Sequence, residues 1–270
     1  MKKFLLILLF LLCLPTFAQY GPQSVKPMLG QQINWGNPLT KGLVGYWLMN
    51  EGGGSKIYDF NENRKNIGTI TNAIWVPGKF GSCLNFDGTG DYVSISGPTV
   101  PGGNAPFTFL AWIYPSSNTA ISDSIIWDLT DQNLLRISES GTTQAQVVFN
   151  AFTTNDRVSS GTGTITLNAW NQVVGLYDGS QMKIYTNGLF RAAVTPTGTY
   201  AASTMSRIGT RGATNDFDGK IDSVMCFNRA LSASEIAELY REPFAMFYDT
   251  DIWWLYSAPV TGEGQIIFVQ

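Results

Sequence analysis

Two turn dipeptides constrain this chain more than any other feature. Asp178-Gly179 and Asn187-Gly188 separate apolar and β-branched runs within residues 173–190. Asp-Gly and Asn-Gly readily adopt the positive φ angles that tight β-hairpin turns require. The stretch therefore predicts three consecutive antiparallel strands joined by two short turns.

Strand-sized runs recur along most of the chain. They are rich in β-branched and aromatic residues and alternate with clusters of Gly, Asn and Asp. The clearest lie at 43–48, 92–96, 107–114, 124–129, 145–149 and 171–177. One later segment is helical instead, because Ser232 and Glu235 form a capping-box pattern and Pro243 ends it. The chain is predicted to be all-β, an antiparallel sandwich with one short C-terminal helix.

Residues 1–18 have the pattern of a secretory signal peptide. Lys2 and Lys3 precede the apolar run 4–14, and Ala18 ends the small-residue exit. The run is too short to cross a bilayer, which takes about 20 apolar residues in a helix. We therefore expect cleavage after Ala18 and export to the medium, the cell surface or the periplasm, with no transmembrane segment.

Composition divides the remaining chain into three parts. Residues 19–41 contain prolines and glycines without apolar periodicity, which is typical of a linker. Residues 42–243 carry the strand and helix patterns of one domain. Residues 244–270 are rich in aromatic side chains, which either add to the domain or offer an apolar patch to a protein partner.

The charge of the chain argues against nucleic acid as a partner, and its cysteines raise the question of a disulfide. The chain has 17 Lys and Arg residues against 20 Asp and Glu residues, so no basic surface suggests nucleic acid. Beyond residues 1–18 the cysteines are Cys83 and Cys226. An oxidising compartment would permit a disulfide between them, and two buried free thiols are an equally good interpretation.

Short motifs follow one another in a fixed order through the domain. They are GLVGYW at 42–47, NEGGG at 50–54, YDFN at 58–61, PGKFG at 77–81, LNFDG at 84–88, DYV at 91–93, YTNG at 185–188, GKIDSV at 219–224 and NRALS at 228–232. This order resembles the laminin G-like jelly roll over residues 42–241, and the flanks look like those of jelly-roll proteins of phages and bacterial metagenomes. The resemblance implies a concanavalin A-like sandwich, a fold used in adhesion, in glycan binding and beside carbohydrate-active enzymes.

The residues argue against catalysis. The chain has no histidine, which excludes Ser-His-Asp and Cys-His arrangements. A glycosidase needs two carboxylates about 5 to 10 Å apart, and no strand segment carries two of the glutamates. We therefore expect a protein that is not an enzyme, with a glycoside hydrolase as the least supported alternative.

Three aspartates are candidate ligands of a structural calcium ion. By strand alternation Asp222 shares a face with Val224, and Asp91 shares a face with Val93. A buried carboxylate is costly unless it is paired or metal-bound, and oxygen ligands suit Ca²⁺. Asp59 resembles the family's loop carboxylate beside a calcium ion. In the alternative interpretation, Asp59 and Asp91 cap turns and Asp222 accepts hydrogen bonds from loop amides.

A glycan site requires aromatic rings and polar groups close to loops. Sugar C–H surfaces stack on rings, and hydroxyl groups need hydrogen-bond partners. The candidates are Tyr58, Trp75 and Trp127, with Asn215 and Asp216 as the polar groups. In the alternative interpretation these aromatic rings belong to the core or plug the ends of the sandwich.

Together, these patterns predict an exported carbohydrate-binding or adhesion module. Its expected partner is a glycan or a cell-surface polysaccharide. The alternative is a structural or interaction protein of a virion or cell surface that acts through residues 244–270.

Overall fold

Two antiparallel sheets packed face to face make up the fold. The computed structural model describes residues 26–28, 30–61, 65–100, 104–116, 124–129, 133–139, 145–150, 156–198, 203–204, 207–210 and 216–248. Within these residues, sheets A and B each contain eight strands, and a small third sheet pairs β7 (Thr99–Val100) with β16 (Ser203–Thr204). The prediction of an all-β antiparallel sandwich is confirmed.

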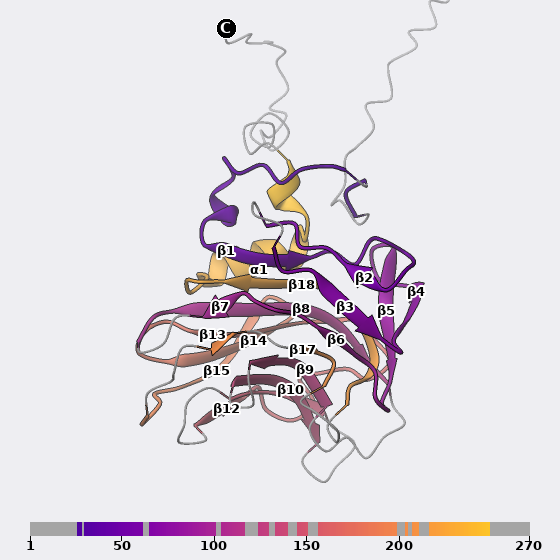
Figure 1. Cartoon of the computed structure of the whole chain (residues 1–270). Helices are drawn as coiled ribbons and strands as arrows, with labels where there is room; N and C mark the ends of the chain where they lie inside the picture. The colour runs from indigo at the N-terminus through magenta and orange to yellow at the C-terminus, as the bar shows by residue number, and fades with distance from the viewer. Residues whose placement is uncertain are drawn as a thin grey trace, which may run out of the picture.

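Sheet A runs in spatial order through β15 (Leu189–Val194), β14 (Met182–Thr186), β13 (Asn171–Tyr177), β8 (Phe107–Pro115), β18 (Asp218–Phe227), β5 (Ser82–Asp87) and β4 (Ile74–Pro77), and β1 (Leu43–Trp47) also pairs with β18. Sheet B runs through β12 (Arg157–Ser159), β11 (Ala145–Asn150), β10 (Asn133–Glu139), β9 (Ser124–Leu129), β17 (Arg207–Ile208), β6 (Tyr92–Ser94), β3 (Gly68–Thr71) and β2 (Lys56–Ile57). Figure 1 shows sheet A descending from β1 and β18 at the top to β15 at the left.

The predicted three-strand meander is confirmed. β13, β14 and β15 are neighbours in sheet A, with Val173 opposite Thr186. Asn187 and Gly188 have φ angles of +52° and +75°, as a two-residue hairpin turn of this type requires. The other strand-sized runs predicted above also form strands.

Apolar side chains form two separate cores. The first lies between the sheets and contains Leu84 of sheet A and Phe149 of sheet B. The second lies on the outer face of sheet A, the face turned away from sheet B, and contains Trp112 and Ile236. Much of sheet A is therefore covered on both faces.

An irregularity in β18 changes which of its side chains face the sheet interface. Ile221 and Val224 both lie in the first core although they are three residues apart. The register shifts after Asp222, and Ser223 has a φ of +49°. Asp222 is instead paired with Trp112 and lies on the outer face. The prediction that Asp222 shares a face with Val224 is wrong, because this β-bulge shifts the alternation by one residue.

Residues 26–41, expected to be part of a linker, pack against the domain instead. The backbone N–H of Asn34 donates to Met246 O, and the Asn37 side chain donates to Ala245 O, both at 2.9 Å. The lead-in contains the short 3₁₀ helix η1 (Pro38–Thr40) and contributes to the second core. Figure 1 shows it at the top of the molecule.

The beginning of the aromatic C-terminal segment also belongs to the domain. Phe244, Met246 and Phe247 are buried, the last two in the 3₁₀ helix η2 (Ala245–Phe247). The rings of Phe244 and Phe80 meet edge to face with centroids 5.2 Å apart. Residues 249–270 lie outside the described residues.

The predicted capping box is confirmed at the start of α1 (Ala233–Arg241). Ser232 Oγ accepts from Glu235 N at 3.2 Å, and Glu235 Oε2 accepts from Ser232 N at 2.8 Å. Ile236 and Leu239 are buried on sheet A. In the described part of the chain, no helix is long and apolar enough to cross a membrane.

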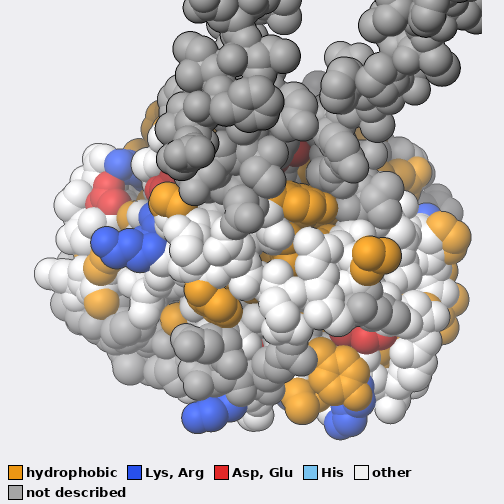
Figure 2. All heavy atoms as spheres, turned by 90° about the horizontal axis from the view of Figure 1, so that it is seen from above, with side chains coloured by type: hydrophobic (Ala, Val, Ile, Leu, Met, Phe, Trp, Pro, Cys, Tyr) orange, Lys and Arg blue, Asp and Glu red, His pale blue; other side chains and the backbone are white. Residues whose placement is uncertain are grey.

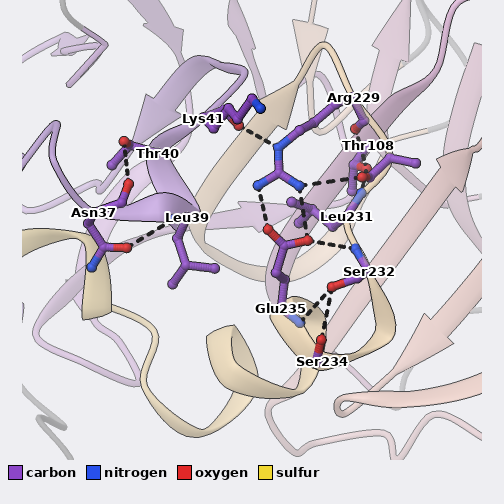
Figure 3. Close-up of polar contacts among 11 residues, drawn as sticks. Asn37, Leu39, Thr40, Lys41, Thr108, Arg229, Leu231, Ser232, Ser234 and Glu235 are labelled. Atoms are coloured by element: carbon purple, nitrogen blue, oxygen red, sulfur yellow. Dashed lines mark hydrogen bonds and ion pairs between the residues drawn. The ribbon is translucent and has the colours of Figure 1, made fainter. Parts of the chain in front are cut away.

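Arg229 links the lead-in, β8 of sheet A and α1 (Figure 3). Its guanidinium group donates two hydrogen bonds to Glu235 at 2.9 and 2.6 Å, and its Nε donates to Lys41 O at 2.5 Å. Thr108 Oγ1 of β8 donates to Arg229 O and accepts from Leu231 N. The lead-in, sheet A and α1 are therefore linked through one side chain and its backbone.

We expect Arg229→Met to lower the free energy of unfolding by about 1–3 kcal/mol, because charge-assisted hydrogen bonds to two separate segments are lost. Lys183→Met is the matched control, since Lys183 pairs with Asp178 at 2.6 Å with similar exposure but only across a hairpin. Its cost should stay below about 1 kcal/mol. Urea denaturation measures both, and equal losses would contradict the role given to Arg229.

Candidate functional site

Two exposed apolar side chains lie at the edge of the sandwich where β4 ends sheet A and β2 ends sheet B. Tyr58 is 52% exposed and Ile74 is 59% exposed. The loop that precedes β2 holds this edge together, because Gly54 O accepts from Trp75 Nε1 and Glu51 Oε1 accepts from Tyr58 N, both at 2.9 Å. Tyr58, Ile74, Trp75 and Glu51 are called the aromatic edge below.

A polar rim adjoins the aromatic edge. Asn72 Nδ2 donates to Gly90 O at 3.2 Å, and Gly90 N donates to Asp216 Oδ2 at 2.7 Å. In the same turn, Asp87 N donates to Asp91 Oδ2 at 2.9 Å. β4 starts two residues after Asn72, so this asparagine links the rim to the strand that carries Ile74 and Trp75.

The carboxylates of the rim influence one another. Burial raises the pKa of Asp91, the hydrogen bond from the Asp87 amide opposes this, and the charges of Asp87 and Asp216 raise the pKa further. Asp216 Oδ1 is buried and has no hydrogen-bond partner among the described residues. A hydroxyl donor from a ligand or a water molecule would satisfy this oxygen.

The structure brings together part of the predicted ligand site. Tyr58 and Trp75 both bond to the loop at residues 51–54, and Asp216 lies on the rim. The partly buried Trp75 also packs against the core between the sheets, as the alternative interpretation expects. The backbone of Trp127 belongs to β9, next to β17 in sheet B, while its side chain lies outside the described part of the structure. Asn215 also lies outside the described residues.

Sequence reasoning missed two contributors to this region. Glu51 stands in a glycine-rich motif that was interpreted only as a family signature. Asn72 has a φ of +59° in the turn between β3 and β4. An Asn between two β-branched runs is a turn signal, so its position could have been predicted but its contact with Gly90 could not.

The Asp59 carboxylate caps a turn, and both of its oxygens already accept hydrogen bonds from the protein. Its Oδ1 accepts from Tyr46 N at 2.9 Å and from Asn61 N at 2.8 Å, and its Oδ2 accepts from Asn66 Nδ2 at 2.6 Å. Burial raises the pKa of Asp59, and these hydrogen bonds act against the rise. The geometry agrees with the alternative in which this carboxylate caps a turn.

Asp222 forms a buried ion pair with Lys26. Lys26 Nζ lies 2.5 Å from Asp222 Oδ1, and both side chains are almost fully buried. The same ammonium group donates to Met49 O at 2.9 Å and to Ser82 O at 2.5 Å. Sequence reasoning missed Lys26, since a single charged residue in a proline-containing segment gives no sign of burial.

The three predicted calcium ligands do not form one site. Asp59 binds backbone amides and an asparagine, Asp91 binds the amide of Asp87, and Asp222 pairs with Lys26. Over the described ranges, no three Asp, Glu or Cys side chains are grouped so that they could hold a metal ion. The three aspartates therefore do not fit one calcium site, and calcium binding itself stays a prediction.

The two cysteines are free and lie on opposite faces of sheet A. Cys226 is part of the core between the sheets. Cys83 packs beside Gly78 and Asp222 on the outer face. Burial raises the pKa of the Cys83 thiol to about 12. The disulfide interpretation is wrong, and the alternative of two buried thiols is confirmed.

Comparison with known proteins identifies a family. A laminin G model described as the concanavalin A-like lectin/glucanases superfamily matches residues 87–237, more than half of the chain. Among curated protein sequences, none matches this chain.

Solved structures with the same fold are distant in sequence. Domain 4 of AbnA, a GH43 extracellular arabinanase from Geobacillus stearothermophilus in complex with arabinotriose, is 18% identical with a TM-score of 0.57, over 73% of this chain and 98% of that domain. The binding domain of Paraclostridial Mosquitocidal Protein 1 is 16% identical with a TM-score of 0.57, over 75% of this chain and 52% of that one. A Trypanosoma rangeli sialidase is 19% identical with a TM-score of 0.56, over 77% of this chain and 34% of that one. These similarities establish the fold alone.

Burial of the Asp222 carboxyl group gives the domain a specific pH dependence. Burial raises the pKa of Asp222 from 3.8 to about 6, and Lys26 and neighbouring backbone amides oppose the rise. The folded state therefore binds a proton more tightly than the unfolded state, and the free energy of unfolding should fall as pH rises from about 4 to about 6. We expect Asp222→Asn to remove this part of the slope in urea denaturation series. Identical slopes in the two proteins would contradict the assignment.

Proposed function

Because the chain belongs to the laminin G-like family of the concanavalin A-like lectin/glucanase superfamily, we propose that it is an exported, non-catalytic module that binds carbohydrate. The observation that carries the proposal is the aromatic edge, where the exposed Tyr58 and the partly exposed Trp75 are both hydrogen-bonded to the loop at residues 51–54. The polar rim, which Asn72 links to the same edge, adds hydrogen-bonding groups.

The chemistry of this region suits a sugar. Tyr58 and Ile74 present apolar surface to solvent, on which the C–H face of a sugar ring can pack. Glu51 and Asp216 supply carboxylate oxygens, and Asp216 Oδ1 has no partner among the described residues. A few convergent polar groups beside ring surface are typical of small-molecule sites.

The non-catalytic role is proposed because the chain lacks the side chains that common hydrolytic sites use. The chain contains no histidine, and the described carboxylates examined above hold turns or an ion pair. The structural neighbours named above include domains of enzymes and a binding domain, so the fold is compatible with either role. Export is proposed from the signal-peptide pattern of residues 1–18.

The alternative role, assembly through the C-terminal segment, depends on residues 249–270. Phe244, Met246 and Phe247 are buried in the domain and are not available to a partner. Among the side chains visible in the view from above, the hydrophobic ones form separate patches (Figure 2). We therefore favour carbohydrate binding.

Glycan binding should depend on Tyr58. We expect a glycan array probed with residues 19–270 to identify ligands, and Tyr58→Ala to weaken the strongest of them about tenfold, since stacking on one ring contributes about 1 kcal/mol or more. Phe190→Ala is the control, because Phe190 is 54% exposed at the opposite edge of sheet A. No binding across diverse polysaccharides would refute the proposed function.

Calcium binding is a separate proposal. An ion bound only to the folded state stabilises it by mass action, so EDTA should lower the melting temperature and added calcium should restore it. Asp59→Ala should lower the melting temperature with and without calcium, because it leaves buried amides without partners. An unchanged melting temperature of the natural protein in EDTA would contradict calcium binding.

A further inference from the structure

A row of partly exposed side chains crosses the outer face of sheet A near the polar rim. In register, Lys220 of β18 lies opposite Asn85 of β5 and Tyr114 of β8. The row continues to Trp170, whose ring meets that of Tyr114 edge to face at 5.6 Å. All four residues are partly exposed. Asn85, Lys220, Tyr114 and Trp170 are called the outer strip below.

Strand alternation determines the direction of the outer strip. Leu84, Ile113 and Ile221, each adjacent to a strip residue in its strand, lie in the core between the sheets, so the strip residues point away from sheet B. At its other end the row reaches Ile74 of the aromatic edge, which is paired with Asn85. The four neighbouring strands from β4 to β8, spaced about 4.8 Å apart, span about 14 Å. The Trp170 ring, 5.6 Å from the Tyr114 ring, extends the row to roughly 20 Å, which suits a chain of sugars better than one ring.

Charges of both signs border the strip. Lys220 Nζ lies 5.3 Å from the centre of the Tyr114 ring, and Lys79 Nζ lies 4.7 Å from the Trp112 ring in the next row. Asp87 and Asp218 are paired with each other at the rim end of β5 and β18. Two ammonium groups and two carboxylates give no net charge to attract a polyanion, whereas sugar hydroxyl groups use both donors and acceptors.

The row next to the strip contains polar groups without partners. Trp112 and Gln172 lie opposite each other on β8 and β13. Gln172 is fully buried, and neither its amide atoms nor Trp112 Nε1 has a hydrogen-bond partner among the described residues. Tyr240 of α1 stacks on Trp112 with centroids 5.6 Å apart and remains 38% exposed. Buried water molecules beneath Tyr240 would satisfy these atoms.

We propose that the outer strip binds an uncharged glycan chain along the outer face of sheet A, with sugar rings on Tyr114 and Trp170 and hydroxyl groups hydrogen-bonded to Asn85 and Lys220. This inference rests on the proposed function and extends it from the aromatic edge across the sheet. The aromatic pair stacks on the chain, and the mixed charges select against acidic polysaccharides.

Calorimetric titration with uncharged hexasaccharides of arabinose, xylose and glucose tests the proposal, with polygalacturonate as the acidic probe. Trp170→Ala and Tyr114→Ala should each weaken binding of the best uncharged probe about tenfold. Trp170→Phe and Tyr114→Phe are the matched controls, since they keep a stacking ring and should lose no more than about threefold. Thermal melts confirm that each variant is folded.

The outcomes separate the outer strip from the aromatic edge. If a probe binds and Tyr58→Ala weakens it while Trp170→Ala and Tyr114→Ala do not, the proposed function stands and the outer strip is refuted. Salt-sensitive binding of polygalacturonate with no uncharged ligand would also refute the strip as a site for uncharged glycans. Absence of binding by the unaltered protein to every glycan would refute both proposals.

Discussion

The bulge in β18 is the constraint on which the two-layered arrangement depends. Ser223 adopts a left-handed conformation, which interrupts the strict alternation of side chains along β18. Ile221 before it and Val224 after it therefore both point into the core between the sheets. β18 can therefore pair with β5 along its first half and with β1 along its second half, while β8 follows its other side. The same shift places the Asp222 carboxylate on the outer face of sheet A, where its burial requires a cationic partner.

That cation comes from outside the jelly roll. Burying Asp222 beside the apolar outer core would be costly without a counter-charge, and Lys26 brings one together with two backbone carbonyl partners. The lead-in is consequently part of the folded unit. Arg229 anchors its other end near α1, so the segments before and after the sandwich form a layer over the part of the outer face of sheet A that holds the second core.

The sequence predicted the local features and missed those that depend on contacts between distant segments. The meander, the strand runs and the capping box of α1 follow from signals within a few residues. The burial of Lys26 does not, because it depends on Asp222, a partner far along the chain. The face of the sheet on which Asp222 lies does not either, because it depends on the single positive φ angle of Ser223. For the candidate site, Tyr58 and Trp75 were found by residue type, whereas the outer strip became visible only from the strand register.

The separation of the two cysteines has a practical meaning for where this domain can fold. Cys83 and Cys226 lie on opposite sides of sheet A, and burial keeps both thiols protonated and shielded from exchange. No described part of the architecture needs an oxidant in order to form. Because these two thiols are too separated to pair, we expect the cytoplasm of an expression host and an extracellular medium to give the same structure of the described domain.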